Sequence, residues 1–132
     1  MKKINNWFEF AQEDLLMAED ALERRIYNQT CFHCQQAIEK TFKGFLQSRN
    51  RNIPRTHFLQ DLLKLCSKMD DEFKTLKKEC AIIDDYYIPT RYPDALPGML
   101  PEGLPQKKDA EEALETLRKI MDFVEKKLKG IK

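Results

Sequence analysis

The sequence predicts an all-α protein, an antiparallel up-and-down helical bundle of about five helices, three long and two shorter. Apolar residues recur every three or four positions over most of the 132-residue chain, and no segment shows the apolar–polar alternation of a strand. A hydrophobic fraction of 42% with 34% charged residues is typical of a folded, helix-rich protein. We expect residues 1–132 to form a single domain around one core.

The first two helices are predicted by apolar stripes at helical spacing. The first runs from Asn5 to about Arg25, and its stripe contains Trp7, Ala11, Leu15, Ala18 and Leu22. The second runs from about Asn28 to Ser48, with a stripe through Cys31, Cys34 or Gln35, Ile38, Phe42 and Phe45. The stretch RNRNIPRT ends this pattern, because proline has no amide proton and disfavours helix in the residue before it.

Two shorter helices and a third long one follow. We expect helices over residues 57–68 and 70–86, a proline-rich loop over about 87–106, and a last helix over 107–130. The last helix has the clearest pattern, with Ala110, Leu114, Leu117, Met121, Val124 and Leu128 on one face. Its acidic residues come early and its lysines late, which complements the helix dipole.

Composition excludes several classes of protein. The net charge is +1, so no global field recruits nucleic acid or membrane, and no apolar run approaches the roughly 18 residues that span a bilayer. The N-terminus carries acidic residues where a signal peptide would be apolar. We therefore expect a cytoplasmic protein with no membrane association, in which the four cysteines are thiols.

The motif CFHC at residues 31–34 has the spacing of zinc and redox sites. A structural zinc needs four ligands, and Cys66 and Cys80 lie too far apart to form a second pair of this kind. Both cysteines of the motif also fall on the apolar side of a helix. We favour core packing over metal or redox chemistry, and expect no metal site and no cofactor.

Charge is segregated within the chain. Residues 40–60 contain no acid but include Lys40, Lys43, Arg49, Arg51 and Arg55, which suits a phosphate-bearing partner, although such a run is more often a solvated loop. Arg51 and His57 add a catalytic possibility, because histidine exchanges protons near neutral pH and arginine stabilises phosphoryl charge. This pair could cleave RNA without metal.

The proline-rich loop contains YYIPTRYPDALPG, residues 86–98. Arg91 can bind a phosphate or carboxylate through two hydrogen bonds, Tyr92 offers a ring for stacking, and Asp94 can accept from a base or ribose. The same residues could instead close the end of the bundle, with Arg91 tied to a neighbouring acid. Long irregular loops in compact domains are often functional.

Four segments together resemble the HEPN domain, in its order and at its spacing. They are WFEFAQEDLLMAEDAL, YNQTCFHCQQAIEKTFKGFL, RTHFLQDLL and YYIPTRYPD. The second, with Gln36, Ala37, Glu39, Lys40 and Lys43, and the RYPD segment carry the resemblance most specifically.

The resemblance implies an antiparallel helical bundle that forms a homodimer. It also implies a two-protein toxin–antitoxin or nucleotide-handling module, with a minimal nucleotidyltransferase as the partner. On this basis Lys40, Lys43, Arg91, Tyr92 and Asp94 are predicted to bind a nucleotide or the partner. Alternatively, Arg51 and His57, with five residues between them, match the Arg-x4-6-His motif of family members that cleave RNA. A third alternative is a purely structural subunit.

Overall fold

The computed structural model describes residues 6–86 and 105–130. These residues form five α-helices and one 3-10 helix, and among them there is no strand. The α-helices are α1 (Asn6–Glu23), α2 (Tyr27–Ser48), α3 (Leu59–Met69), α4 (Lys77–Asp84) and α5 (Lys107–Leu128), and the 3-10 helix is η1 (Asp71–Leu76). The predicted all-α class and the three long helices are confirmed.

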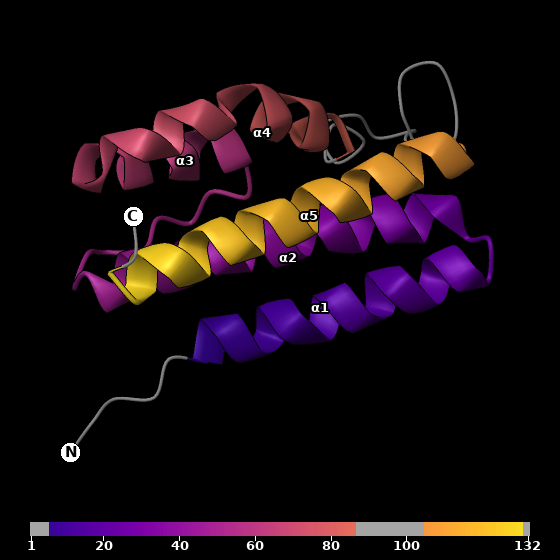
Figure 1. Ribbon diagram of the computed structural model, residues 1–132, viewed down its shortest axis with the longest axis horizontal. Helices are drawn as coiled ribbons and strands as arrows, with labels where there is room; N and C mark the ends of the chain where they lie inside the picture. Colours follow the sequence, from indigo (N-terminus) through magenta and orange to yellow (C-terminus); the bar gives the residue numbers. More distant parts are fainter. Residues whose placement is uncertain (1–5, 87–104, 131–132) are drawn as a thin grey trace.

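Helices α1, α2 and α5 lie side by side, and α3 with η1 and α4 lies on the side of α2 and α5 away from α1 (Figure 1). The chain reverses direction between α1 and α2 and again between α3 and η1–α4 (Figure 1). The connection over residues 49–58 instead returns along α2, so α3 runs parallel to α2 (Figure 1). Contacts between Gln35 and His57, and between Phe42 and Cys66, follow this parallel order.

The core forms where the apolar stripes of the helices meet. Phe73 lies at its centre, with ring centroids 4.7 Å from Phe45, 6.1 Å from Phe42 and 5.0 Å from Phe123. This one residue of η1 therefore joins α2 and α5. Gly44 lets the Phe8 ring of α1 pack directly on the α2 backbone, because a Cβ atom at this position would come within 2.7 Å of that ring.

The helix predicted over residues 70–86 is divided, which corrects that expectation. Asp70 ends α3 in an extended conformation and its carboxylate accepts from the amide of Glu72 at 3.0 Å, which starts η1. Six residues of 3-10 helix then bring Phe73 and Leu76 into the core before α4 begins. Tight hydrogen bonding by an Asp side chain is a usual way to start such a short segment.

Within the described ranges, no helix combines the length and hydrophobicity needed to cross a membrane. The four cysteines are buried thiols, and Cys31 and Cys34 belong to the core as predicted. Burial raises the pKa of the Cys31 and Cys66 thiols to about 12. Among the described residues no cluster of three or more His, Cys, Asp or Glu side chains could hold a metal ion.

Candidate functional site

Five polar residues of α2 lie along one side of the helix and are called here the α2 polar seam: Gln35, Gln36, Glu39, Lys40 and Lys43. Spacings of three and four residues place them in adjacent rows on the helix surface. Three of them are buried, with exposed fractions of 0% for Gln35, 4% for Glu39 and 6% for Lys43. Buried polar groups must find hydrogen-bond partners inside the protein.

Glu39 is the centre of the seam. Its Oε2 atom accepts from Nζ of Lys43 at 2.9 Å and lies 3.3 Å from Nδ1 of His57. The contact is a hydrogen bond in the tautomer of His57 that carries the proton on Nδ1, because an ionised carboxylate only accepts. The His57 side chain is 54% exposed while the Glu39 side chain is 6% exposed. The buried Glu39 carboxylate thus contacts the half-exposed His57 imidazole on its protein-facing side. This arrangement orients a histidine for proton transfer.

The other oxygen of Glu39, Oε1, is buried and has no hydrogen-bond partner among the described residues. The carboxylate therefore uses one oxygen for two donors and leaves the second unsatisfied. Such a group carries a free-energy penalty of about 1–3 kcal/mol.

The backbone around His57 is fixed from two sides. Nε2 of Gln35 donates to the carbonyl of His57 at 2.7 Å, and Gln36 in turn donates to Oε1 of Gln35 at 2.6 Å. On the other side, the Asp84 carboxylate accepts from the amides of Leu59 at 2.7 Å and Gln60 at 3.0 Å.

Asp84 comes from the end of α4 and caps the start of α3, where helix amides lack partners. Burial raises the pKa of Asp84, although the two backbone hydrogen bonds oppose the shift. The position of the imidazole is therefore set by side chains of α2 and α4.

Arg51 lies at the C-terminal end of α3, whereas His57 lies at its N-terminal end. Its Nε donates to the sulfur of Met69, the last residue of α3, at 3.1 Å. His57 precedes the first residue of α3 by two positions. The helix has 11 residues, so at a rise of 1.5 Å per residue its ends are about 15 Å apart. The structure does not bring Arg51 and His57 of one chain together.

Lys40 and Lys43, predicted to bind a nucleotide, both form ion pairs within the chain. Lys43 pairs with Glu39 and also lies 5.6 Å from the centroid of the Trp7 ring. Lys40 pairs with Oδ2 of Asp14 on α1 at 2.5 Å, and its side chain is 27% exposed. The charge of each lysine is therefore balanced by a buried carboxylate, and only Lys40 has appreciable contact with solvent.

Asp14 joins this network to His33. Nδ1 of His33 lies 2.9 Å from Oδ1 of Asp14, so the carboxylate has a partner on each oxygen. Burial works to raise the pKa of Asp14, but the hydrogen bonds from His33 and Lys40 outweigh it and hold the pKa below its ordinary value of 3.8. Asp14 is thus ionised at neutral pH and ties α1 to the polar side of α2.

Arg91, Tyr92 and Asp94, predicted in the proline-rich loop, lie outside the described residues. The loop prediction itself, over about 87–106, overlaps the described residues only at its end. There Gln106 and Asp109 form a reciprocal capping box at the start of α5, with the Gln106 amide donating to Asp109 at 2.8 Å. Tyr86, at the other end of the loop, is buried in the core, and this burial raises the pKa of its hydroxyl.

Sequence reasoning missed the roles of Asp14, Glu39 and Asp84. A signal for each was present, because each acid occupies a position of an apolar stripe. Asp14 stands between Ala11 and Ala18 at helical spacing, for example. An acid at a core position indicates a buried partner. The sequence alone does not show which residue that partner is.

A family model described as "HEPN domain" matches residues 4–127. The chain belongs to the HEPN family. It is 28% identical over 128 residues to a Methanocaldococcus jannaschii protein named "Putative toxin MJ1304", an alignment that covers 90% of this chain and 84% of that protein. The family resemblance expected from the sequence is confirmed.

Two solved structures of similar chains share the fold of this HEPN protein. TT1696 from Thermus thermophilus superposes with a TM-score of 0.78 at 35% identity, covering 94% of this chain and 99% of that one. The second, described as "ST0689, an archaeal HEPN homologue", superposes with a TM-score of 0.75 at 29% identity, covering 97% and 99%. The coverage shows that the similarity extends over nearly the whole of each chain.

Proposed function

We propose that this HEPN protein is the toxin-like member of a two-protein module, and that it binds a nucleotide or a minimal nucleotidyltransferase partner. The similarity to MJ1304 supports the toxin-like role. The separation of Arg51 from His57 by the length of α3 supports binding over cleavage most directly, because a single chain does not assemble the Arg–His pair. A group that stabilises phosphoryl charge must lie next to the reacting atoms.

An exposed apolar surface on α1 supports a protein partner, either a second copy of the chain or the nucleotidyltransferase. Phe10 is 46% exposed, Leu16 64% and Met17 53%. Phe10 and Met17 are seven residues apart and share one face of α1, and Leu16 lines the same hollow as Met17. Exposed large apolar side chains that lie near one another mark interaction surfaces more often than scattered ones do. Homodimer formation and binding of the nucleotidyltransferase both belong to this proposal.

Arg91→Ala is expected to weaken binding of the nucleotide or of the partner by about tenfold or more, since a charge-assisted hydrogen bond contributes about 1.5–3 kcal/mol. Calorimetric titration with nucleoside triphosphates, and co-purification with a nucleotidyltransferase encoded beside the gene, measure the two interactions. Arg24→Ala is the matched control, because Arg24 is exposed and pairs with Asp20 one turn away. If both variants bind the nucleotide and the partner as tightly as the wild type, the RYPD segment has a structural role and no role in binding.

A second candidate is metal-independent RNA cleavage at a site shared by two chains. The observation that favours it is the contact between the buried Glu39 carboxylate and the half-exposed His57 imidazole. In this arrangement His57 would transfer the proton of the ribose 2′-hydroxyl, and Arg51 of a second chain would stabilise the phosphoryl charge. The distance between Arg51 and His57 within one chain is the reason for placing them in different chains.

A further inference from the structure

The exposed side of α1 combines acidic and apolar side chains. Helix α1 contains six acids and no basic residue. The apolar residues Phe10, Leu16 and Met17 are exposed, and each lies three or four residues from Glu13. Residues at these spacings are neighbours on a helix surface. We call the exposed acids and the three apolar residues together the acidic–apolar face of α1: Glu9, Phe10, Glu13, Leu16, Met17, Asp20 and Glu23.

Most of the negative charge of this face is uncompensated. Within the part of the chain that the structure describes, Glu9, Glu13 and Glu23 form no ion pair. Asp20 pairs with Arg24 at 3.7 Å, an exposed pair that solvent screens. Four acids against one arginine leave three negative charges on this face, in a chain whose total charge is +1.

A hollow of about 360 Å³ lies beside two of the apolar side chains. Its lining is Leu16, Met17, Glu19, Asp20 and Glu23. Glu19 is already paired with Arg118 at 2.7 Å, so Asp20 and Glu23 are the acids nearest to the hollow that lack a strong partner. A matching occupant buries an apolar side chain against Leu16 and Met17 and places a cation beside these two acids.

We propose that the acidic–apolar face of α1 binds a basic amphipathic helix of a different protein. A helix suits this face because Phe10 and Met17 are seven residues apart, and a packed helix presents its side chains at the same repeat. Apolar anchors supply the affinity, and lysine or arginine residues beside them meet the acids. The inference rests on the proposed function in one respect, since that function includes a protein partner.

A second copy of the chain is the less suitable occupant in a two-fold arrangement. A two-fold contact places the same surface of both copies face to face. Glu13 and Asp20 lie three or four residues from Leu16 and Met17, so burial of these anchors would bring carboxylates against carboxylates. Like charges that face one another across an interface cost several kcal/mol.

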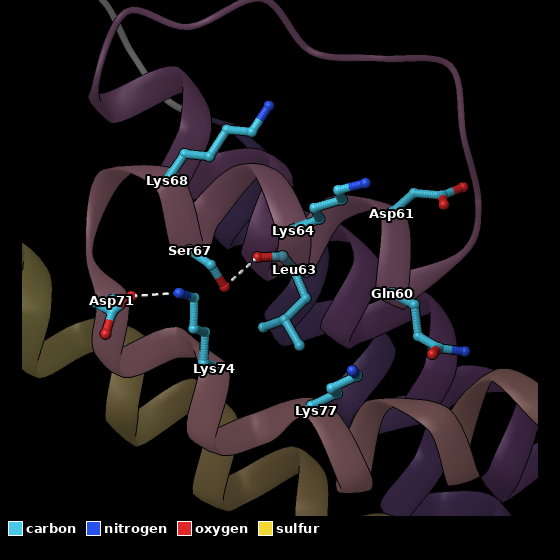
Figure 2. Close-up of a pocket in the computed structure, with 9 residues that line it drawn as sticks. All are labelled: Gln60, Asp61, Leu63, Lys64, Ser67, Lys68, Asp71, Lys74 and Lys77. Carbon is cyan, nitrogen blue, oxygen red and sulfur yellow. Dashed lines mark hydrogen bonds and ion pairs between the residues drawn. The ribbon is translucent and has the colours of Figure 1, made fainter.

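The basic surface of the chain itself also fits this face poorly. Figure 2 shows that surface, a groove between α3 and the η1–α4 segment with Lys64, Lys68, Lys74 and Lys77 around it. This groove lies on the side of α2 and α5 away from α1, so its contact with α1 of a second copy is head-to-tail and does not close (Figure 1). Leu63 is the one apolar residue of its lining and is only 4% exposed, so the groove offers no anchor to Leu16 or Met17.

The test uses two labelled peptides of roughly 14 residues with leucines at helical spacing, one with lysines at the other positions and one with glutamates. Fluorescence anisotropy measures their affinity for the purified protein. Met17→Ser removes an anchor, and Ile82→Ser on α4 is its matched control, because the two side chains are 53% and 52% exposed. Circular dichroism checks that both variants are folded.

A second pair of variants tests the charge. Glu13→Gln with Glu23→Gln removes two acids of the face, and Glu111→Gln with Glu115→Gln removes two exposed acids of α5. We expect the α1 pair to weaken binding of the leucine–lysine peptide by about fivefold at low salt and less at high salt, and the α5 pair to change it by less than about twofold.

We expect the wild-type protein to bind the leucine–lysine peptide and not the leucine–glutamate peptide. Met17→Ser should weaken this binding by about fivefold or more, and Ile82→Ser by less than about twofold. Equal binding of both peptides, no binding of either, or equal losses in a variant and its matched control would overturn the proposal.

Sedimentation distinguishes a second copy from a different protein. We expect Met17→Ser to have the same molecular mass in solution as the wild type. Dissociation of a wild-type dimer by Met17→Ser would assign the face to a second copy and overturn the proposal. Because the peptide experiment uses neither a nucleotide nor a nucleotidyltransferase, this inference and the proposed function can fail separately.

Discussion

Glu39→Ala is expected to destabilise the protein by about 3–5 kcal/mol, because it leaves the Lys43 ammonium buried without a counter-ion. The two side chains are 6% and 7% exposed, so water cannot replace the lost carboxylate. The same change removes the contact that holds the His57 imidazole. Urea unfolding followed by circular dichroism measures the loss as a lower midpoint with an unchanged slope.

A double variant separates the charge from the packing. Glu39→Leu combined with Lys43→Met removes both charges and keeps similar volume, and we expect it to be near the wild type in stability or above it. The double variant should therefore recover most of the free energy that Glu39→Ala loses. A loss below about 1 kcal/mol for Glu39→Ala alone would show that the pair is solvated and that this description of the seam is wrong.

Phe73→Ala is also expected to destabilise the protein strongly, by about 3–5 kcal/mol, through loss of buried area and the cavity left behind. The ring is fully buried and contacts Phe42, Phe45 and Phe123 from two long helices. Because η1 is short, no other aromatic residue of that segment can take its place. Thermal and urea unfolding measure the effect.

Phe10→Ala is the matched control for this prediction. It deletes the same ring from α1, where the side chain is 46% exposed, and we expect a change within about 1 kcal/mol. Similar losses for both variants would mean that Phe73 is not the centre of the core. A small loss at Phe73 alone would mean that neighbouring side chains close the cavity.

Much of the fold could be predicted because helical spacing of apolar residues is a local signal. The stripes of α1, α2 and α5 placed those helices within a few residues of their observed ends. The parallel course of α3 beside α2 could not be predicted, since it depends on where residues 49–58 find hydrogen bonds on α2. The division into η1 and α4 depends on the Asp70 cap and on packing of Phe73, both of which are outcomes of tertiary structure.

The site was predicted less completely than the fold. Spacing in the sequence put five residues between Arg51 and His57, but an extended segment between them carries the two side chains to opposite ends of α3. Lys40 and Lys43 stood out as cations, while their counter-ions Asp14 and Glu39 were hidden in apolar stripes. The sequence shows that a residue is a cation. It does not show which acidic residue neutralises that cation in the folded protein.

Under the proposed function, a single chain binds a nucleotide or a partner and does not carry a complete nuclease site. Incubation of RNA with the purified wild-type protein in excess chelator tests this most directly, beside Arg51→Ala, His57→Ala and an equal mixture of these two variants. We predict that the RNA stays intact in every sample. Cleavage by the wild type that is lost in each variant and restored in their mixture would contradict this prediction and establish a site shared by two chains.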